Sequence, residues 1–220
     1  MSLATSSKLS AQISTQTYTP SHQYIAQLEQ LYQERSLIPC AAGQPVHLHP
    51  NRLYVVCRGM VQLHTIHADG NDTIVGLCGS SMAFGHPLTG LAPYWATALV
   101  ATDILPLSLS EVESSPTLAA GVFPQVVRRL QQTEAWLALS GKRLVADRLK
   151  GLIVQLAQDF GQVGTDGVRI NVRLTHHQLA TIIGTTRVTV TRLLRDFRAQ
   201  GWLNVRQRRL IVSRDELGVS

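Results

Sequence analysis

Residues 174–198, LTHHQLATIIGTTRVTVTRLLRDFR, constrain the fold of this chain more than any other segment. Thr175 with a glutamine three residues later has the pattern of a capping box, which predicts the start of a helix. Gly184 supplies the backbone freedom that a tight turn between two helices requires. A second helix should then begin at Thr185 or Thr186. Its apolar residues recur at the i, i+3, i+4, i+7 spacing of a buried face: Val190, Leu193, Leu194 and Phe197.

The opposite face of this second helix is rich in arginine and in β-branched residues. Arginine can bond guanine O6 and N7 together, and threonine or valine can contact a thymine methyl group. A helix–turn–helix with such a face is typical of major-groove reading, and the alternative is a solvated arginine-rich helix. We assign base contacts to Arg187, Val188, Thr191 and Arg192.

Residues 201–212 form two short apolar runs on either side of Arg206-Gln207-Arg208-Arg209. This pattern predicts a β-hairpin with a cationic tip, a wing that would lie along the DNA backbone. Side chains of this kind, together with hydroxyl groups and helix N-termini, hold phosphates without reading the base sequence. We assign phosphate contacts to Thr175, His176, Thr185, Thr186, Thr189, Arg195, Arg206, Arg208 and Arg209.

Charge is divided unevenly along the 220 residues. Residues 1–140 carry 6 Lys and Arg against 8 Asp and Glu, whereas residues 141–220 carry 14 against 6. A mildly acidic body joined to a strongly basic end indicates a polyanionic partner for that end. The alternative, a solvated cationic surface, has the same composition.

Cysteine usage and hydropathy favour a cytoplasmic protein. The three cysteines are Cys40, Cys57 and Cys78, an odd number without a C-x-x-C pair, so neither a disulfide framework nor a zinc site is predicted. The first 20 residues are polar and do not resemble a signal peptide, and we expect a flexible arm there. No apolar run reaches the roughly 18 residues of a membrane-spanning helix.

Residues 38–109 have a sequence pattern that is typical of a β domain. Short β-branched and apolar runs alternate with turn residues, and Asp69-Gly70 is a strong hairpin signal. Such regularly spaced strands predict an antiparallel sandwich or barrel. A short helix is expected before them, over residues 21–35, because apolar residues recur there at helical spacing.

From Val122 the apolar period becomes helical. Its narrow 4-3 spacing favours a coiled-coil seam, and hence a dimerisation helix over residues 122–144. A helix packed on its own domain is the alternative. The predicted dimer residues are Val126, Leu130, Thr133, Leu137, Ser140 and Leu144. We divide the chain into an arm (1–20), a β domain (21–121), this helix (122–144) and a DNA-binding domain (145–220), an α+β architecture.

The run GTTRVTVTRLLRDFR resembles the CRP/FNR superfamily of transcription regulators, most closely its cyanobacterial nitrogen-control branch, NtcA. That branch has valine after the first recognition arginine, as Val188 follows Arg187 here. The resemblance implies a double-stranded β-helix (jelly roll) effector domain, a long dimer helix and a C-terminal winged helix-turn-helix. It also implies a homodimer on a palindromic promoter site of the GTA…TAC type, base reading by Arg187, Val188 and Arg192, and recruitment of RNA polymerase.

The resemblance also bears on the effector. The cAMP-binding branch uses a Gly-Glu pair and an Arg-Ser or Arg-Thr pair, where this chain has Gly85-His86 and Tyr94-Trp95-Ala96, so cAMP is not expected. The nitrogen-control branch binds 2-oxoglutarate, and Arg129 and Glu134 fall at its effector-binding positions, although Tyr94 replaces its loop arginine. 2-Oxoglutarate, a different small effector and no effector all stay open, and a salt-bridged Arg129–Glu134 pair is the alternative. The candidate effector residues are Phe84, Gly85, His86, Pro87, Tyr94, Arg129 and Glu134.

Two alternative functions, from other classes of protein, remain. His47 and His49 would share one face of a strand and weakly resemble a cupin metal motif, which suggests a cupin-like enzyme fused to a DNA-binding end. Without a third ligand we assign no metal site. The other reading is an interaction module whose β domain binds a regulatory protein. We find no nucleophile–base set, P-loop or acidic pair, and therefore expect no enzymatic activity.

Overall fold

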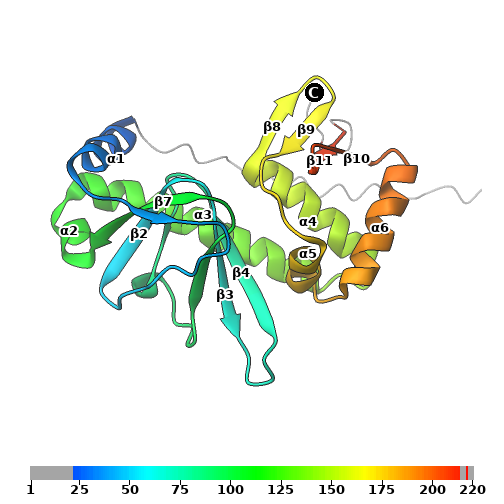
Figure 1. Ribbon diagram of the computed structural model, residues 1–220, viewed down its shortest axis with the longest axis horizontal. Coiled ribbons are helices and arrows are strands. Elements are labelled where there is room, and N and C mark those ends of the chain that lie inside the picture. Colours follow the sequence, from blue (N-terminus) through cyan, green and yellow to red (C-terminus); the bar gives the residue numbers. More distant parts are fainter. Residues whose placement is uncertain (1–21, 214–216, 218–220) are drawn as a thin grey trace, which may run out of the picture.

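A computed structural model describes residues 22–213 and Leu217. The arm expected over residues 1–20 lies outside this part of the chain. The described residues form a β domain and a helical C-terminal domain, which the long helix α3 connects (Figure 1). Among the described helices, none is both long enough and apolar enough to cross a bilayer.

The β domain is built from two antiparallel sheets. One has the order β1-β7-β2-β5 and the other the order β4-β3-β6. Their inner faces enclose a core that includes Tyr54, Leu63, Phe84 and Ile104. The predicted Asp69-Gly70 turn joins β3 to β4, and Gly70 has the positive φ of 83° that this turn requires. The bounds are β1 Ile38–Cys40, β2 Arg52–Arg58, β3 Val61–Ile66, β4 Asp72–Cys78, β5 Ala83–Phe84, the 3-10 helix His86–Leu88, β6 Trp95–Ala98 and β7 Thr102–Ser108.

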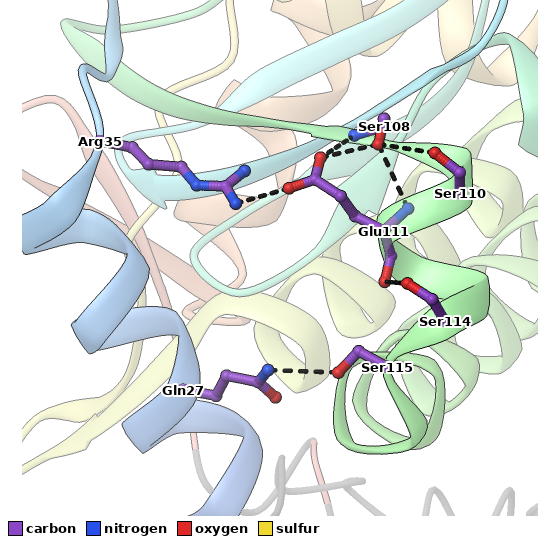
Figure 2. Close-up of polar contacts among 7 residues, drawn as sticks. All are labelled: Gln27, Arg35, Ser108, Ser110, Glu111, Ser114 and Ser115. Carbon is purple, nitrogen blue, oxygen red and sulfur yellow. Dashed lines mark hydrogen bonds and ion pairs between the residues drawn. The ribbon is translucent and has the colours of Figure 1, made fainter.

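Three helices cover the outer face of the first sheet. The helix expected near the N-terminus is α1, His22–Glu34, and it packs with α2, Leu109–Ser114, and α3 over a cluster that includes Leu28, Leu105 and Leu118. Gly121 of α3 permits this approach, because a Cβ there would lie 1.9 Å from the ring of Tyr24. Polar contacts between α1 and the starts of α2 and α3 complete the packing (Figure 2).

The connecting helix α3 runs from Pro116 to Ser140, so the predicted bounds of 122–144 are wrong at both ends. Ser115 caps its first turn by accepting a hydrogen bond from the Leu118 backbone N–H, and proline is favoured at the first helical position. At the other end, Leu144 lies beyond the helix and is the N-cap residue of α4. The seam predicted across this boundary therefore belongs to two helices.

The C-terminal domain is a winged helix-turn-helix. A four-stranded sheet, β10-β11-β9-β8, packs with three helices around a core that includes Leu149, Ile153, Val190 and Phe197. The bounds are α4 Val145–Phe160, β8 Gly161–Gly164, β9 Gly167–Ile170, α5 His176–Ile183, α6 Arg187–Ala199, β10 Leu203–Arg206 and β11 Arg209–Val212.

The two domains share buried contacts. Met60, Ile74 and Leu77 of the β domain belong to the same apolar cluster as the core of the C-terminal domain. Gln178 of α5 donates a hydrogen bond from Nε2 to Oε1 of Gln62 on β3, at 2.7 Å. The winged helix-turn-helix domain is thus held directly against the β3–β4 hairpin as well as through α3.

Candidate nucleic-acid interface

Local capping interactions position both helices of the helix–turn–helix. The Thr175 hydroxyl accepts from the Gln178 backbone N–H at 3.1 Å, and the Thr175 N–H donates to Gln178 Oε1 at 2.8 Å. The predicted capping box is therefore present. Gly184 ends α5 with a φ of 62°, and the Thr186 hydroxyl accepts from the Thr189 N–H at 3.2 Å. Thr186 is thus the N-cap of α6, which begins at Arg187.

The two faces of α6 are as different as the sequence predicts. Val190, Leu193, Leu194 and Phe197 are buried in the domain core. On the other side, the Val188 side chain is 78% exposed. The four predicted base-contact residues, Arg187, Val188, Thr191 and Arg192, are all exposed.

A hydrogen-bonded pair joins the start of α5 to this face. His176 Nδ1 lies 2.8 Å from the Thr191 hydroxyl, which donates its proton to the Arg187 carbonyl at 2.9 Å. Because a hydroxyl has a single proton, Nδ1 of His176 carries the proton in their shared bond. The Thr191 methyl group then remains free to contact a base.

The wing arginines differ in their contacts. Arg206 Nη1 lies 2.6 Å from Asp166 Oδ2, and Arg209 Nη1 donates to the Asn171 carbonyl at 2.6 Å. Arg208 stands at the exposed tip with a positive φ of 61°, as Gln207 does with 52°, and within the described residues no hydrogen bond or ion pair is found for its side chain. Arg208 is therefore the wing cation best placed to meet a phosphate.

The predicted phosphate-contact residues surround the exposed face of α6. Thr175, His176, Thr186, Arg195, Arg206 and Arg208 are exposed, whereas Thr185, Thr189 and Arg209 are half-buried. The Thr189 hydroxyl lies 3.0 Å from that of Thr186, so this pair is already partly satisfied. The structure gathers the set on one domain, and its contacts with DNA stay predictions.

The predicted dimer seam is largely exposed along α3 and continues to the start of α4. Leu130, Leu137 and Leu144 are 57%, 71% and 60% exposed, whereas Val126 is half-buried against the β domain. Thr133 and Ser140 are exposed beside them. Phe123, 68% exposed and one heptad before Leu130, was missed by the sequence reading. An apolar stripe on a helix surface is typical of a protein–protein contact.

Five of the seven candidate effector residues lie in the β domain, and a sixth, Arg129 of α3, contacts one of them. Phe84 and Tyr94 are buried, Gly85 and Pro87 lie beside them in sequence, and the rings of His86 and Tyr94 are 5.8 Å apart. Arg129 Nη1 donates to the Tyr94 hydroxyl at 3.4 Å. Burial raises the pKa of Tyr94 to about 12, and the Arg129 charge lowers it in part. Tyr94 is therefore a neutral donor and acceptor at physiological pH.

Glu134, the seventh candidate, does not join this group. It is exposed, and the ion pairs of the described residues do not include one between Arg129 and Glu134. Five residues along a helix correspond to a rotation of about 500°, which places the two side chains on different faces. The alternative of a salt-bridged pair on α3 is not found.

Gln125 is a polar residue of this region that the sequence reading missed. It is 1% exposed, and both atoms of its side-chain amide are buried without a hydrogen-bond partner, as is Nε of Arg129. The two residues are one helical turn apart and so share a face of α3. The signal in the sequence was a glutamine at an apolar position of the helical pattern.

The histidine pair suggested for a metal has different contacts. The rings of His47 and His49 are 5.0 Å apart, and the Tyr54 hydroxyl accepts from the His49 N–H and donates to the His47 carbonyl. In the described residues there is no group of three or more His, Cys, Asp or Glu positioned to hold a metal ion.

Comparisons with known proteins agree with this architecture. Residues 147–218 match the family described as the Crp-like helix-turn-helix domain. The chain is 33% identical over 181 residues to the regulatory protein CysR of Synechococcus elongatus, which covers 81% of this chain and 80% of that protein. The chain belongs to the CRP/FNR superfamily. It is also 31% identical to the global nitrogen regulator of Synechocystis, over 73% of this chain and 76% of that protein.

Solved structures of the CRP/FNR superfamily share the fold. FixK2 from Bradyrhizobium japonicum aligns with a TM-score of 0.68 at 18% identity, over 83% of this chain and 95% of that one. A CRP-family regulator from Thermus thermophilus aligns with a TM-score of 0.67 at 19% identity, over 83% and 97%. The predicted fold class is confirmed. The chain is a DNA-binding transcription regulator of a family whose members act as dimers, and the cupin-like alternative is not favoured.

Proposed function

We propose that a homodimer of this chain binds a palindromic promoter site in the cytoplasm, with α6 of each protomer in the major groove, and recruits RNA polymerase there. The observation that carries this proposal is the exposed face of α6, with Val188 78% exposed between two arginines. The N-terminus of α5 and the wing lie in the same domain and would hold phosphates on either side. In this proposal the protein has no catalytic activity.

Two arginines should play different parts in DNA binding. Arg187→Ala should lose about 1–3 kcal/mol of discrimination between the operator and random DNA, because a bidentate contact to guanine is removed. Arg208→Ala should weaken binding to both DNAs by the same factor, because phosphates are alike in every sequence.

Fluorescence anisotropy with a GTA…TAC duplex and a scrambled duplex measures both effects. Arg58→Ala, a change at an exposed arginine of the β domain, serves as the control. An equal loss on both duplexes for Arg187→Ala would remove its assignment as a base-reading residue.

We further propose that a small carboxylate, with 2-oxoglutarate as the first candidate, binds the face of α3 that carries Gln125 and Arg129. Support comes from the buried, unpartnered polar atoms of these two side chains, beside the Tyr94 hydroxyl. A guanidinium can hold a carboxylate through two parallel bonds, and an amide can bond a second oxygen of the ligand. cAMP is not favoured, since Gly85-His86 offers the ribose no carboxylate.

Thermal unfolding with and without each ligand tests the effector. 2-Oxoglutarate should raise the melting temperature of the wild type, because a ligand that binds the folded state alone stabilises it. Arg129→Gln should abolish the rise, and Glu134→Gln, a change outside the group, should keep it. A rise of equal size in Arg129→Gln would rule out this site.

A further inference from the structure

A cavity of about 460 Å³ lies in the C-terminal domain, outside the region considered for the effector. Its volume is within the range of about 300–1,000 Å³ that small-molecule sites occupy. The floor is aliphatic and includes Leu156, Ile170, Leu179 and Leu194, each of which is 5% exposed or less. Val205 of the wing adds to the apolar wall. The site therefore favours a hydrocarbon or aromatic body.

The rim of this cavity is cationic. Four arginines line it, Arg173, Arg195, Arg198 and Arg208, and none of the described residues that line it is acidic. The carboxylate of Asp196 lies 3.7 Å from Nε of Arg195, and both side chains are exposed to water, which screens the pair. A rim of this composition attracts an anion rather than a cation.

We propose that the cavity binds a small amphipathic anion, an apolar body on the aliphatic floor with a carboxylate or sulfonate at the arginine rim. The sugar–phosphate backbone of DNA can meet the rim but has no apolar group to cover the floor. A ligand with both parts gains from burying its apolar surface as well as from the charge.

Binding of this ligand and binding of DNA exclude each other if the proposed DNA contacts are made. Five of the residues that line the cavity are also predicted DNA contacts: Thr175, His176, Thr191, Arg195 and Arg208. An anion at the rim would occupy the place of a phosphate and neutralise the charge that attracts it. The regulator would then have an inhibitory site within its DNA-binding domain.

Isothermal titration of the full-length protein with 2-naphthoate tests the site. We expect saturable binding with one equivalent per chain. 2-Naphthamide, which has the same rings without the charge, should bind at least tenfold more weakly, and inorganic phosphate should not saturate in the same range. Equal binding of the amide would overturn the anionic assignment, and equal binding of phosphate would overturn the apolar one.

Two substitutions locate the site. Val205→Trp should fill the cavity and reduce naphthoate affinity at least tenfold, whereas Val163→Trp, at a valine of β8 that is 59% exposed and outside the cavity, should not. Should Val205→Trp fail to fold by circular dichroism, Arg198→Gln replaces it, because Arg198 lines the rim without being a predicted DNA contact. Unchanged affinity in the folded variant would overturn the proposal.

Competition separates the two proposals. Naphthoate should raise the apparent dissociation constant of a labelled GTA…TAC duplex linearly with the free naphthoate concentration, and should do so no longer in Val205→Trp. If naphthoate binds and DNA affinity stays constant, the exclusion of DNA is wrong. If the duplex is not bound without naphthoate, the proposed DNA contacts fail, while the calorimetric result for the cavity stands.

Discussion

Glu111 connects the start of α2 to the residue that follows α1 through its two carboxylate oxygens. One oxygen accepts from the Ser108 backbone N–H at 2.7 Å, and the other lies 2.5 Å from the Arg35 guanidinium (Figure 2). Arg35 first, and then Ser108, lower the pKa of Glu111 to about 2. Since the folded-state pKa is lower than the unfolded one, this carboxylate stabilises the fold above about pH 4.5.

Glu111→Gln should therefore lower the free energy of unfolding at pH 7 but not near pH 2. Glutamine can keep the capping box, so the change removes the charge alone. Because both side chains are more than one third exposed, we expect a loss below about 1 kcal/mol.

Urea unfolding at a series of pH values measures this loss, with Glu113→Gln on the exposed side of α2 as the control. The stabilisation should decline as pH falls from 4.5 toward 2. A loss that does not depend on pH would show that the ion pair with Arg35 is not its source.

Residues whose partners are near in sequence were predictable. Thr175 and Thr186 cap helices through residues three positions away, and Gly184 ends the helix before the turn. The spacing of these residues was enough to infer their roles. Gln125 and Gln132 are buried although they are polar, and their positions in the helical pattern do not say which distant groups they meet.

At the scale of the element, the exposed stripe of α3 is the feature that most needs a partner. Phe123, Leu130 and Leu137 are spaced by heptads, and Leu144 continues the stripe at the start of α4. Burying such residues between two copies of the helix would follow the seam of a coiled coil.

Leu137→Glu should dissociate the dimer, because a carboxylate would replace an apolar contact in the seam. We expect a loss of more than about 2 kcal/mol of association free energy, the usual cost of deleting a buried leucine. Sedimentation velocity distinguishes the two states, and Gln131→Glu places the same charge on an exposed position of α3 outside the stripe. A dimer that survives Leu137→Glu would show that the stripe faces another partner.

The boundaries of α3 show what a periodic pattern omits. The apolar period begins near Val122, but the helix begins at Pro116, where a serine N-cap and a first-position proline mark the start. Those local signals are present in the sequence, and the apolar period alone does not include them. The end of the helix at Ser140 depends on how α4 packs back against α3. The apolar spacing within one helix carries no information about that packing.

At the scale of the whole molecule, a buried glutamine links three segments. Gln132 of α3 is 2% exposed, and its Oε1 accepts from the Leu77 N–H of β4 at 2.8 Å. Its Nε2 donates to Asp159 Oδ2 of α4 at 3.0 Å. Burial raises the pKa of Asp159, and the hydrogen bond from Gln132 opposes that rise. The β domain and the DNA-binding domain thus meet at one polar cluster.

Gln132→Leu should destabilise the protein by about 1–3 kcal/mol for each buried group left unpaired. The pKa of Asp159 should rise further without its donor, and a raised folded-state pKa means that stability falls as pH rises through it. The loss should therefore be larger at pH 7 than at pH 4. Urea unfolding at both pH values measures the difference, and Gln131→Leu, at the exposed neighbouring position, is the control. An equal loss of stability at both pH values would show that Asp159 does not contribute to it.

The order of the domains followed from the change of period along the chain, but their docking did not. Gln62 and Gln178 are far apart in sequence and meet only because the β3–β4 hairpin lies against α5. Neither glutamine stands in a motif that names its partner. The candidate effector group was found through resemblance, and its unsatisfied atoms became visible only with α3 in place.

The wing has a consequence for how binding responds to ionic strength. Each phosphate neutralised by a protein cation displaces bound counterions, which gives a slope of about −0.9 in a plot of log K against log salt concentration. Arg206 already faces Asp166, and Arg209 is bonded to Asn171. The wing of each protomer should therefore contribute about one such unit, from Arg208, rather than three. On binding DNA, a wing with three arginines would then release about as many counterions as a single cation does.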